Sequence, residues 1–197
     1  MTRFDYPHCD DPALESFATV AQEFCDLVDR RAVVSRDELL LGVHRLLPLL
    51  YVRALALPST DVLFDMSSAD DDEQPGETVL VDANADRRSH DEWSMLMREL
   101  AAIIGPDRYY REVFDPYEPP EEGEVTANLA DDIADIYADL RDGLAKWARG
   151  ESGEALWAWR FGFEGHWGEH ATGALRALWA RAAWHDLPWP AGSGDAA

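Results

Sequence analysis

Residues 157–184 read WAWRFGFEGHWGEHATGALRALWARAAW, and this stretch decides the fold. Aromatic and aliphatic side chains recur throughout it, and few of its residues are charged. At about 3.6 residues per turn, these side chains cover every side of a helix. A helix that is apolar all round has to be enclosed by other elements. We therefore predict that this stretch is the central helix of an all-α domain and that its tryptophans pack in the core.

Four further helices are predicted upstream from apolar residues at helical spacing. Their ranges are 11–31, 35–57, 89–104 and 126–149. The first begins with Asp11-Pro12, because proline suits the first helical position. Ser35 with Glu38, and Ser89 with Glu92, have the spacing of a capping box, which marks where a helix begins. With the Trp/Gly-rich helix, which runs from about Ser152 to His185, these segments predict a bundle of about five main helices.

Two acidic loops separate these helices. The first, residues 60–88, loses the helical period and contains a short extended piece at 78–81. The second, residues 117–125, combines Pro119-Pro120 with several glutamates and follows a brief helical turn at 109–113. Since 197 residues with 47% hydrophobic content suit one core, we predict a single domain over residues 1–190 and a disordered tail at 191–197.

The charge of the chain restricts its partners. It carries 39 acidic against 17 basic residues, a net charge of −22. This field repels nucleic acids and anionic membrane surfaces and favours a basic protein partner or metal ions, although acidic residues also serve solubility alone. Cys9 and Cys25 lack metal or redox spacing, and no signal peptide or stretch of about 20 apolar residues is present. We therefore predict a cytoplasmic protein that binds neither nucleic acid nor membrane, while the oligomeric state stays open.

One motif indicates a metal site. His166, Glu169 and His170 have the HxxEH spacing of inverted zincins, in which two histidines one helical turn apart bind zinc and the glutamate activates water. Only 27 residues follow His170, and they hold few acids. A third ligand has to come from upstream, and Asp132 or Asp139 are the candidates because both border the apolar stripe of helix 126–149. The metal is then zinc or another divalent transition metal.

Close packing is the alternative interpretation of the same segment, and we prefer it. The glycines at positions 162, 165, 168 and 173 each cost about 1 kcal/mol in a helix, and close approach of another helix offsets such a cost. Under this interpretation His166 and His170 are core or boundary residues hydrogen-bonded to a carboxylate or carbonyl group. The other aspartates of helix 126–149, Asp131, Asp135 and Asp142, are expected to lie opposite its apolar stripe and face water.

Three stretches of the C-terminal half resemble an uncharacterised bacterial family, a domain of unknown function. They are YYxxVFDP at 109–116, LADDIxDIYxDL at 129–140 and WxWRFxFxxHWGxHA at 157–171. The resemblance implies an all-helical single domain and supplies no activity. Two hypotheses follow from the sequence. The preferred one is a non-catalytic interaction or adaptor protein, without cofactor, whose acidic surface engages a basic partner. The alternative is a metal-binding protein or metal-dependent hydrolase that uses His166, Glu169 and His170.

Overall fold

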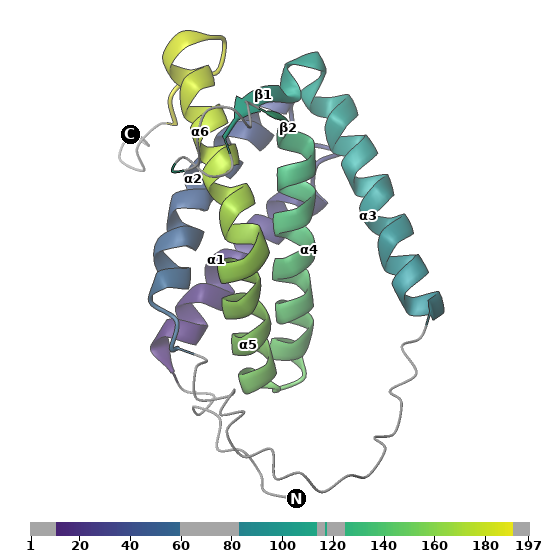
Figure 1. The fold of residues 1–197 in the computed structure, drawn as a ribbon, viewed down its shortest axis with the longest axis vertical. Coiled ribbons are helices and arrows are strands. Elements are labelled where there is room, and N and C mark those ends of the chain that lie inside the picture. Colours follow the sequence, from purple (N-terminus) through teal and green to yellow (C-terminus); the bar gives the residue numbers. More distant parts are fainter. Residues whose placement is uncertain (1–10, 60–82, 114–116, 118–124, 191–197) are drawn as a thin grey trace, which may run out of the picture.

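The computed structural model describes residues 11–59, 83–113, 117 and 125–190, with the side chains of 83–89 left out (Figure 1). The predicted all-α, single-domain bundle of about five main helices is confirmed. Its elements are α1 (Pro12–Asp29), α2 (Arg36–Leu55), α3 (Ala83–Ile104), the 3₁₀ turn η3 (Pro106–Arg108), β1 (Tyr109–Glu112), β2 (Val125–Asn128), α4 (Leu129–Ala148), α5 (Ser152–Gly162), the π-helical turn η5 (Phe163–Trp167) and α6 (Gly168–Trp184). The segments α5, η5 and α6 follow one another directly and form the fifth helix.

Helices α1 and α2 begin where local signals predict. The Asp11 carboxylate accepts the backbone N–H of Ala13 at 2.8 Å, and Ser35 and Glu38 form the complete capping box of α2. Helix α3 is longer than predicted, since it begins at Ala83, so the acidic loop predicted at 60–88 ends earlier. Residues 60–82 of that loop, most of the loop at 117–125 and the tail at 191–197 lie outside the described residues.

A short hairpin replaces the predicted helical turn at 109–113. Strand β1 pairs antiparallel with β2, with Tyr109 opposite Asn128 and Glu112 opposite Val125. Burial alternates along β1, so Tyr110 and Glu112 face inward. The prediction of a helical turn was wrong because the partner strand, which satisfies the backbone groups of β1, lies more than ten residues away in the chain.

Helix α4, and not the Trp-rich helix, holds the centre of the bundle. It contacts α1, α3, α5 and α6, and Figure 1 shows it between α3 and the α5–α6 column. The Trp-rich helix buries one side only. Trp159 and Trp167 are fully buried, whereas Phe161 is 57% and Trp184 is 70% exposed. The prediction that this helix is enclosed on all sides was therefore wrong, because its aromatic residues serve both the core and the surface.

The glycines at 165 and 168 of the Trp-rich helix do not mark the close contact with another helix that the packing interpretation expected. A Cβ at Gly168 would lie 2.2 Å from the carbonyl oxygen of Phe163 in the π-helical turn, and a Cβ at Gly165 would meet nothing within 4 Å. The tight helix contact lies on α4 instead. At Gly143 a Cβ would lie 2.0 Å from the indole Nε1 of Trp159, which donates to the carbonyl oxygen of Leu140 at 3.3 Å. Helix α5 thus approaches α4 through an indole laid on a glycine.

None of the helices in the described part of the chain is long and apolar enough to span a membrane.

Candidate metal centre

Two helices present complementary side chains to each other. Asp132, Asp135 and Asp139 lie on α4 at spacings of three and four residues, so they share one face of that helix. His166 lies in the π-helical turn η5, and His170 lies one turn later in α6. Both η5 and α6 contact α4. The imidazole rings of one helix therefore lie beside the carboxylates of the other.

Each histidine is held by a carboxylate through the same ring nitrogen. The Nδ1 atom of His166 lies 2.8 Å from Asp139 Oδ2, and that of His170 lies 3.0 Å from Asp132 Oδ1. An ionised carboxylate only accepts hydrogen bonds, so both Nδ1 atoms carry the proton and donate it. The Nε2 atom of each neutral ring then has a free lone pair. This is the tautomer in which a histidine binds a metal through Nε2.

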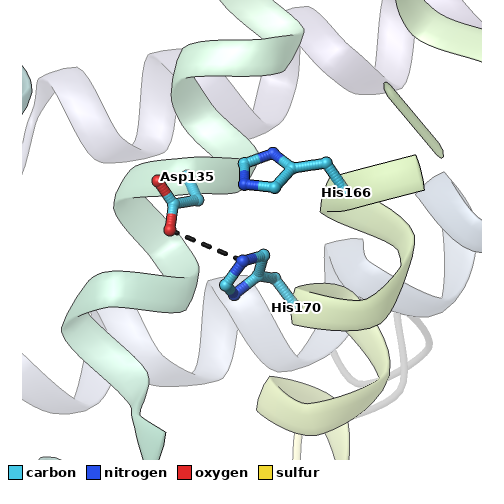
Figure 2. Close-up of side chains that lie close together, drawn as sticks. All are labelled: Asp135, His166 and His170. Carbon is cyan, nitrogen blue, oxygen red and sulfur yellow. Dashed lines mark ion pairs between the residues drawn. The ribbon is translucent and has the colours of Figure 1, made fainter. Parts of the chain in front are cut away.

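Asp135 lies on α4 across from the two rings, which contact each other with ring centres 5.0 Å apart. Figure 2 shows its carboxylate facing both imidazoles, and Asp135 Oδ2 lies 3.6 Å from His170 Nε2. Its other oxygen accepts a hydrogen bond from the indole N–H of Trp93 on α3 at 2.8 Å. Asp135, His166 and His170 each offer a ligand atom, and these atoms lie within 4.8 Å of one another. Among the described residues they form the one group with this geometry.

The hairpin supports this arrangement from behind. The hydroxyl of Tyr110 donates to Asp132 Oδ2 at 2.9 Å and lies 3.2 Å from Glu112 Oε2. Gly173 on α6 makes this contact possible, because a Cβ there would lie 2.6 Å from the Tyr110 hydroxyl and 2.4 Å from Glu112 Oε1. Asp132 is thus held on one oxygen by the hairpin and on the other by His170. Its orientation is fixed from two sides.

The electrostatics of the cluster favour a bound cation. Burial raises the pKa of Asp132, and the hydrogen bonds from His170 and Tyr110 oppose that rise. Burial also raises the pKa of Asp135, opposed by His170. The hydrogen bond to Asp132 raises the pKa of His170 above its ordinary value, with Asp135 adding to the effect. Closely spaced carboxylates away from water gain from any positive charge placed among them, either a proton on His170 or a metal ion.

The five residues singled out from the sequence have different places in this cluster. His166 and His170 point at α4, and Asp132 and Asp139 contact them as hydrogen-bond acceptors on Nδ1. Glu169 is exposed and is not part of the group of three. The side chain of His166 is 51% exposed, so it lies at the boundary of the bundle and not in the core.

Asp135 was assigned to the solvated face, and that prediction was wrong. Trp93 and His170, from α3 and α6, cover its side chain and leave 18% of it exposed. A signal for its role was present in the sequence. Asp135 lies three residues after Asp132 and four before Asp139, so all three had to face the same neighbour.

Residues 10–183 match the family described as "Domain of unknown function (DUF5063)". The chain belongs to this family. The resemblance of the three C-terminal stretches to an uncharacterised family, a domain of unknown function, is confirmed. The solved structures include a similar one, the crystal structure of protein BF1032 from Bacteroides fragilis. It is 25% identical in sequence, with a TM-score of 0.61, over 86% of this chain and 92% of that one. No curated protein matches this DUF5063 chain.

Proposed function

We propose that this DUF5063 protein binds a divalent transition-metal ion through Nε2 of His166, Nε2 of His170 and a carboxylate oxygen of Asp135. The observation that carries the proposal is the pairing of both Nδ1 atoms with aspartates, at 2.8 and 3.0 Å. Metal-binding histidines almost always donate their other ring N–H to such a partner, which fixes the tautomer and makes the ring a stronger ligand. Asp132 and Asp139 therefore act as supports and not as ligands.

The distances suit a metal ion of ordinary size. Two ligand atoms bound at about 2.0–2.1 Å in tetrahedral geometry lie about 3.4 Å apart. Asp135 Oδ2 and His170 Nε2 are 3.6 Å apart, close to that separation. Without a proton or cation between them, these two atoms would both be acceptors facing each other. The half-exposed ring of His166 has room to move the remaining distance, since the group spans up to 4.8 Å.

The donor set restricts the choice of metal and of chemistry. Two imidazoles and one carboxylate suit zinc, iron, cobalt or manganese better than calcium, which takes only oxygen ligands. Three protein ligands leave at least one coordination position for water or a substrate, as in catalytic and not structural zinc sites. The exposed Glu169 is outside the group, so the site does not follow the inverted zincin scheme.

Metal analysis of untagged protein tests the proposal. We expect close to one equivalent of a single transition metal, and a melting temperature that rises with added Zn²⁺, Fe²⁺ or Mn²⁺ after chelation. A ligand at about 100 times its Kd stabilises the folded state by about 2.7 kcal/mol. Less than a tenth of an equivalent of metal, together with no thermal shift, would refute the proposal.

Variants separate ligands from supports. Asp135→Asn and His170→Gln should abolish stoichiometric binding, whereas Asp139→Asn should weaken it by about 10- to 100-fold, the usual effect of losing a supporting carboxylate. Glu169→Gln and His185→Gln are the matched controls, because both side chains are exposed and outside the group. Both controls should bind metal as the unmodified protein does. Equal loss in Glu169→Gln would favour the original HxxEH assignment instead.

The interaction role with a basic protein partner stays a prediction, and so does the cytoplasmic location. Both rest on composition, above all on the net charge of −22. Capture of a reproducible partner that is released at raised ionic strength would support the first, because salt screens contacts between exposed charges. An empty capture at low salt would contradict it.

A further inference from the structure

A cavity lies at the C-terminal part of α6, next to the β1–β2 hairpin and away from the histidine cluster. It is a cavity of about 620 Å³ between η3, β1, the first residue of α4 and the C-terminal part of α6. Leu129 and the small residues Ala177 and Ala180 form apolar walls, and the rings of Tyr109 and Tyr110 add aromatic ones. This volume lies within the usual range for small-molecule sites, which are mostly apolar with a few polar groups.

Charged residues at the cavity and beside it form a network of ion pairs. Asp186 Oδ2 lies 3.1 Å from Arg36 Nη1, and Asp186 Oδ1 lies 2.5 Å from Arg181 Nη2. Asp107 Oδ2 lies 3.3 Å from Arg36 and 3.8 Å from Arg181. Asp37 Oδ1 also lies 3.8 Å from Arg36 Nη1, so two guanidinium groups face three carboxylates. The pKa of Asp186 is lowered to about 2, first by Arg36 and then by Arg181. Arg36 and Arg181 are therefore both paired with carboxylates.

Arg108 is a further positively charged residue of the cavity lining and is not part of this network. None of the described carboxylates lies within ion-pair distance of it, although the chain as a whole is strongly acidic. Its guanidinium lies 4.3 Å from the centre of the Tyr109 ring and donates to the carbonyl oxygen of Gly105 at 2.8 Å and to the Tyr109 hydroxyl at 2.7 Å. Its Nε is buried and has no acceptor. Arg108 therefore brings to the cavity wall a guanidinium group that has no ion-pair partner among the described residues.

Unpaired donors gather at this cavity. Among the described residues, three buried side-chain nitrogens lack a partner, and two of them, Nε of Arg108 and Nε of Arg181, belong to residues that line it. Arg181 as a whole is only 7% exposed. Leaving a buried donor without an acceptor costs about 1–3 kcal/mol. Both atoms are covered from solvent in this structure, so they would gain an acceptor only if the two side chains moved on binding.

We propose that this cavity binds the carboxylate group of a small aromatic acid. The carboxylate pairs with Arg108, and the ring lies against Leu129, Ala177 and Ala180. One unpaired guanidinium group suits one negative charge, whereas a phosphate would bring a second charge towards Asp107 and Asp186. The planar guanidinium fork matches a carboxylate in geometry as well as in charge. This site does not depend on the metal proposal, although Tyr110 lines the cavity and also donates to Asp132.

Titration with benzoate, followed by NMR of methyl groups in metal-free protein, tests the proposal. Benzoate should shift the methyl signals of Leu129, Ala177 and Ala180 in a saturable way. Benzyl alcohol has the same ring without the charge and should bind at least about tenfold more weakly, since a charge-assisted pair is typically worth that much. Inorganic phosphate should not displace benzoate. Shifts that do not saturate, equal binding of the alcohol, or displacement by phosphate would each overturn the proposal.

Variants at the cavity provide the second test. Arg108→Gln should weaken benzoate binding by about tenfold. Arg98→Gln is the matched control, because Arg98 is exposed on α3 and, among the described residues, donates to the carbonyl oxygen of Ser94 in its own helix. It should leave binding unchanged. If Arg108→Gln does not fold, Arg108→Lys keeps the charge without the guanidinium fork and should bind several-fold more weakly. Unchanged affinity in a folded Arg108 variant would overturn the assignment.

Discussion

Replacing Gly143 by alanine should destabilise the protein, although alanine is the better helix former. Gly143 is buried on α4, and the indole of Trp159 lies directly on it. An added Cβ would be 2.0 Å from Nε1, 2.4 Å from Cδ1 and 2.5 Å from Cε2 of that ring. Trp159 is fully buried and packs on Phe17, with ring centres 5.0 Å apart, so the indole has no free space to enter.

Three effects set the size of the change. Alanine in place of glycine favours a helix by about 1 kcal/mol. Overpacking a core costs about 1–3 kcal/mol, and an overlap of this depth belongs at the upper end of that range. Moving the indole also breaks its 3.3 Å hydrogen bond to the carbonyl oxygen of Leu140, which is worth about 1 kcal/mol. We therefore expect a net loss of about 3 kcal/mol, or a melting temperature lower by about 6–12 °C for a domain of this size.

Urea unfolding followed by tryptophan fluorescence measures this loss. Gly165→Ala is the matched control, since Gly165 also lies in the helical column but a Cβ there meets nothing within 4 Å. That control should be neutral or more stable by up to about 1 kcal/mol. If Gly143→Ala proves as stable as the unmodified protein, with an unchanged slope of free energy against urea, the close contact between α4 and α5 does not determine stability and our reasoning is wrong.

Three further predictions follow from single contacts. In a Cys9→Ser background, Cys25 should resist alkylation at pH 8 in the folded protein and react only on unfolding, because burial raises its pKa to about 12. Rapid alkylation of Cys25 in the folded protein, measured by mass spectrometry, would contradict this. Asp186→Asn should be less stable than the unmodified protein above about pH 4, and the difference should vanish as the pH falls through about 2. The pKa of Asp186 is lower in the folded than in the unfolded protein, so the stabilisation that its carboxylate provides is lost on acidification. Urea unfolding at each pH tests this. Gly173→Ala should push Tyr110 and Glu112 away from α6 and speed hydrogen exchange in the β1–β2 hairpin but not in α1, whereas unchanged hairpin exchange would show that the contact at Gly173 is not tight.

The candidate site was only partly predictable from the sequence. The spacing of His166 and His170 placed both rings on one face, and the position of Asp132 and Asp139 beside the apolar stripe of α4 placed them inward. Their roles as supports on Nδ1, however, depend on distances of 2.8 and 3.0 Å between side chains of different helices. The third member of the group, Asp135, was missed because its burial comes from α3 and α6 and not from α4 itself.

By itself, the sequence determined that the chain forms helices and where α1 and α2 begin. Apolar residues at helical spacing, the capping box at Ser35 and the cap at Asp11 act over a few residues, so they specify helices wherever the chain goes. Only the tertiary structure decided which helix occupies the centre and which side chains meet there. Helix α4 is central because α1, α3, α5 and α6 all pack against it. The Trp-rich helix keeps one side exposed because its neighbours cover only its other side. Such contacts join residues far apart in the chain, and no local pattern encodes which partners will meet.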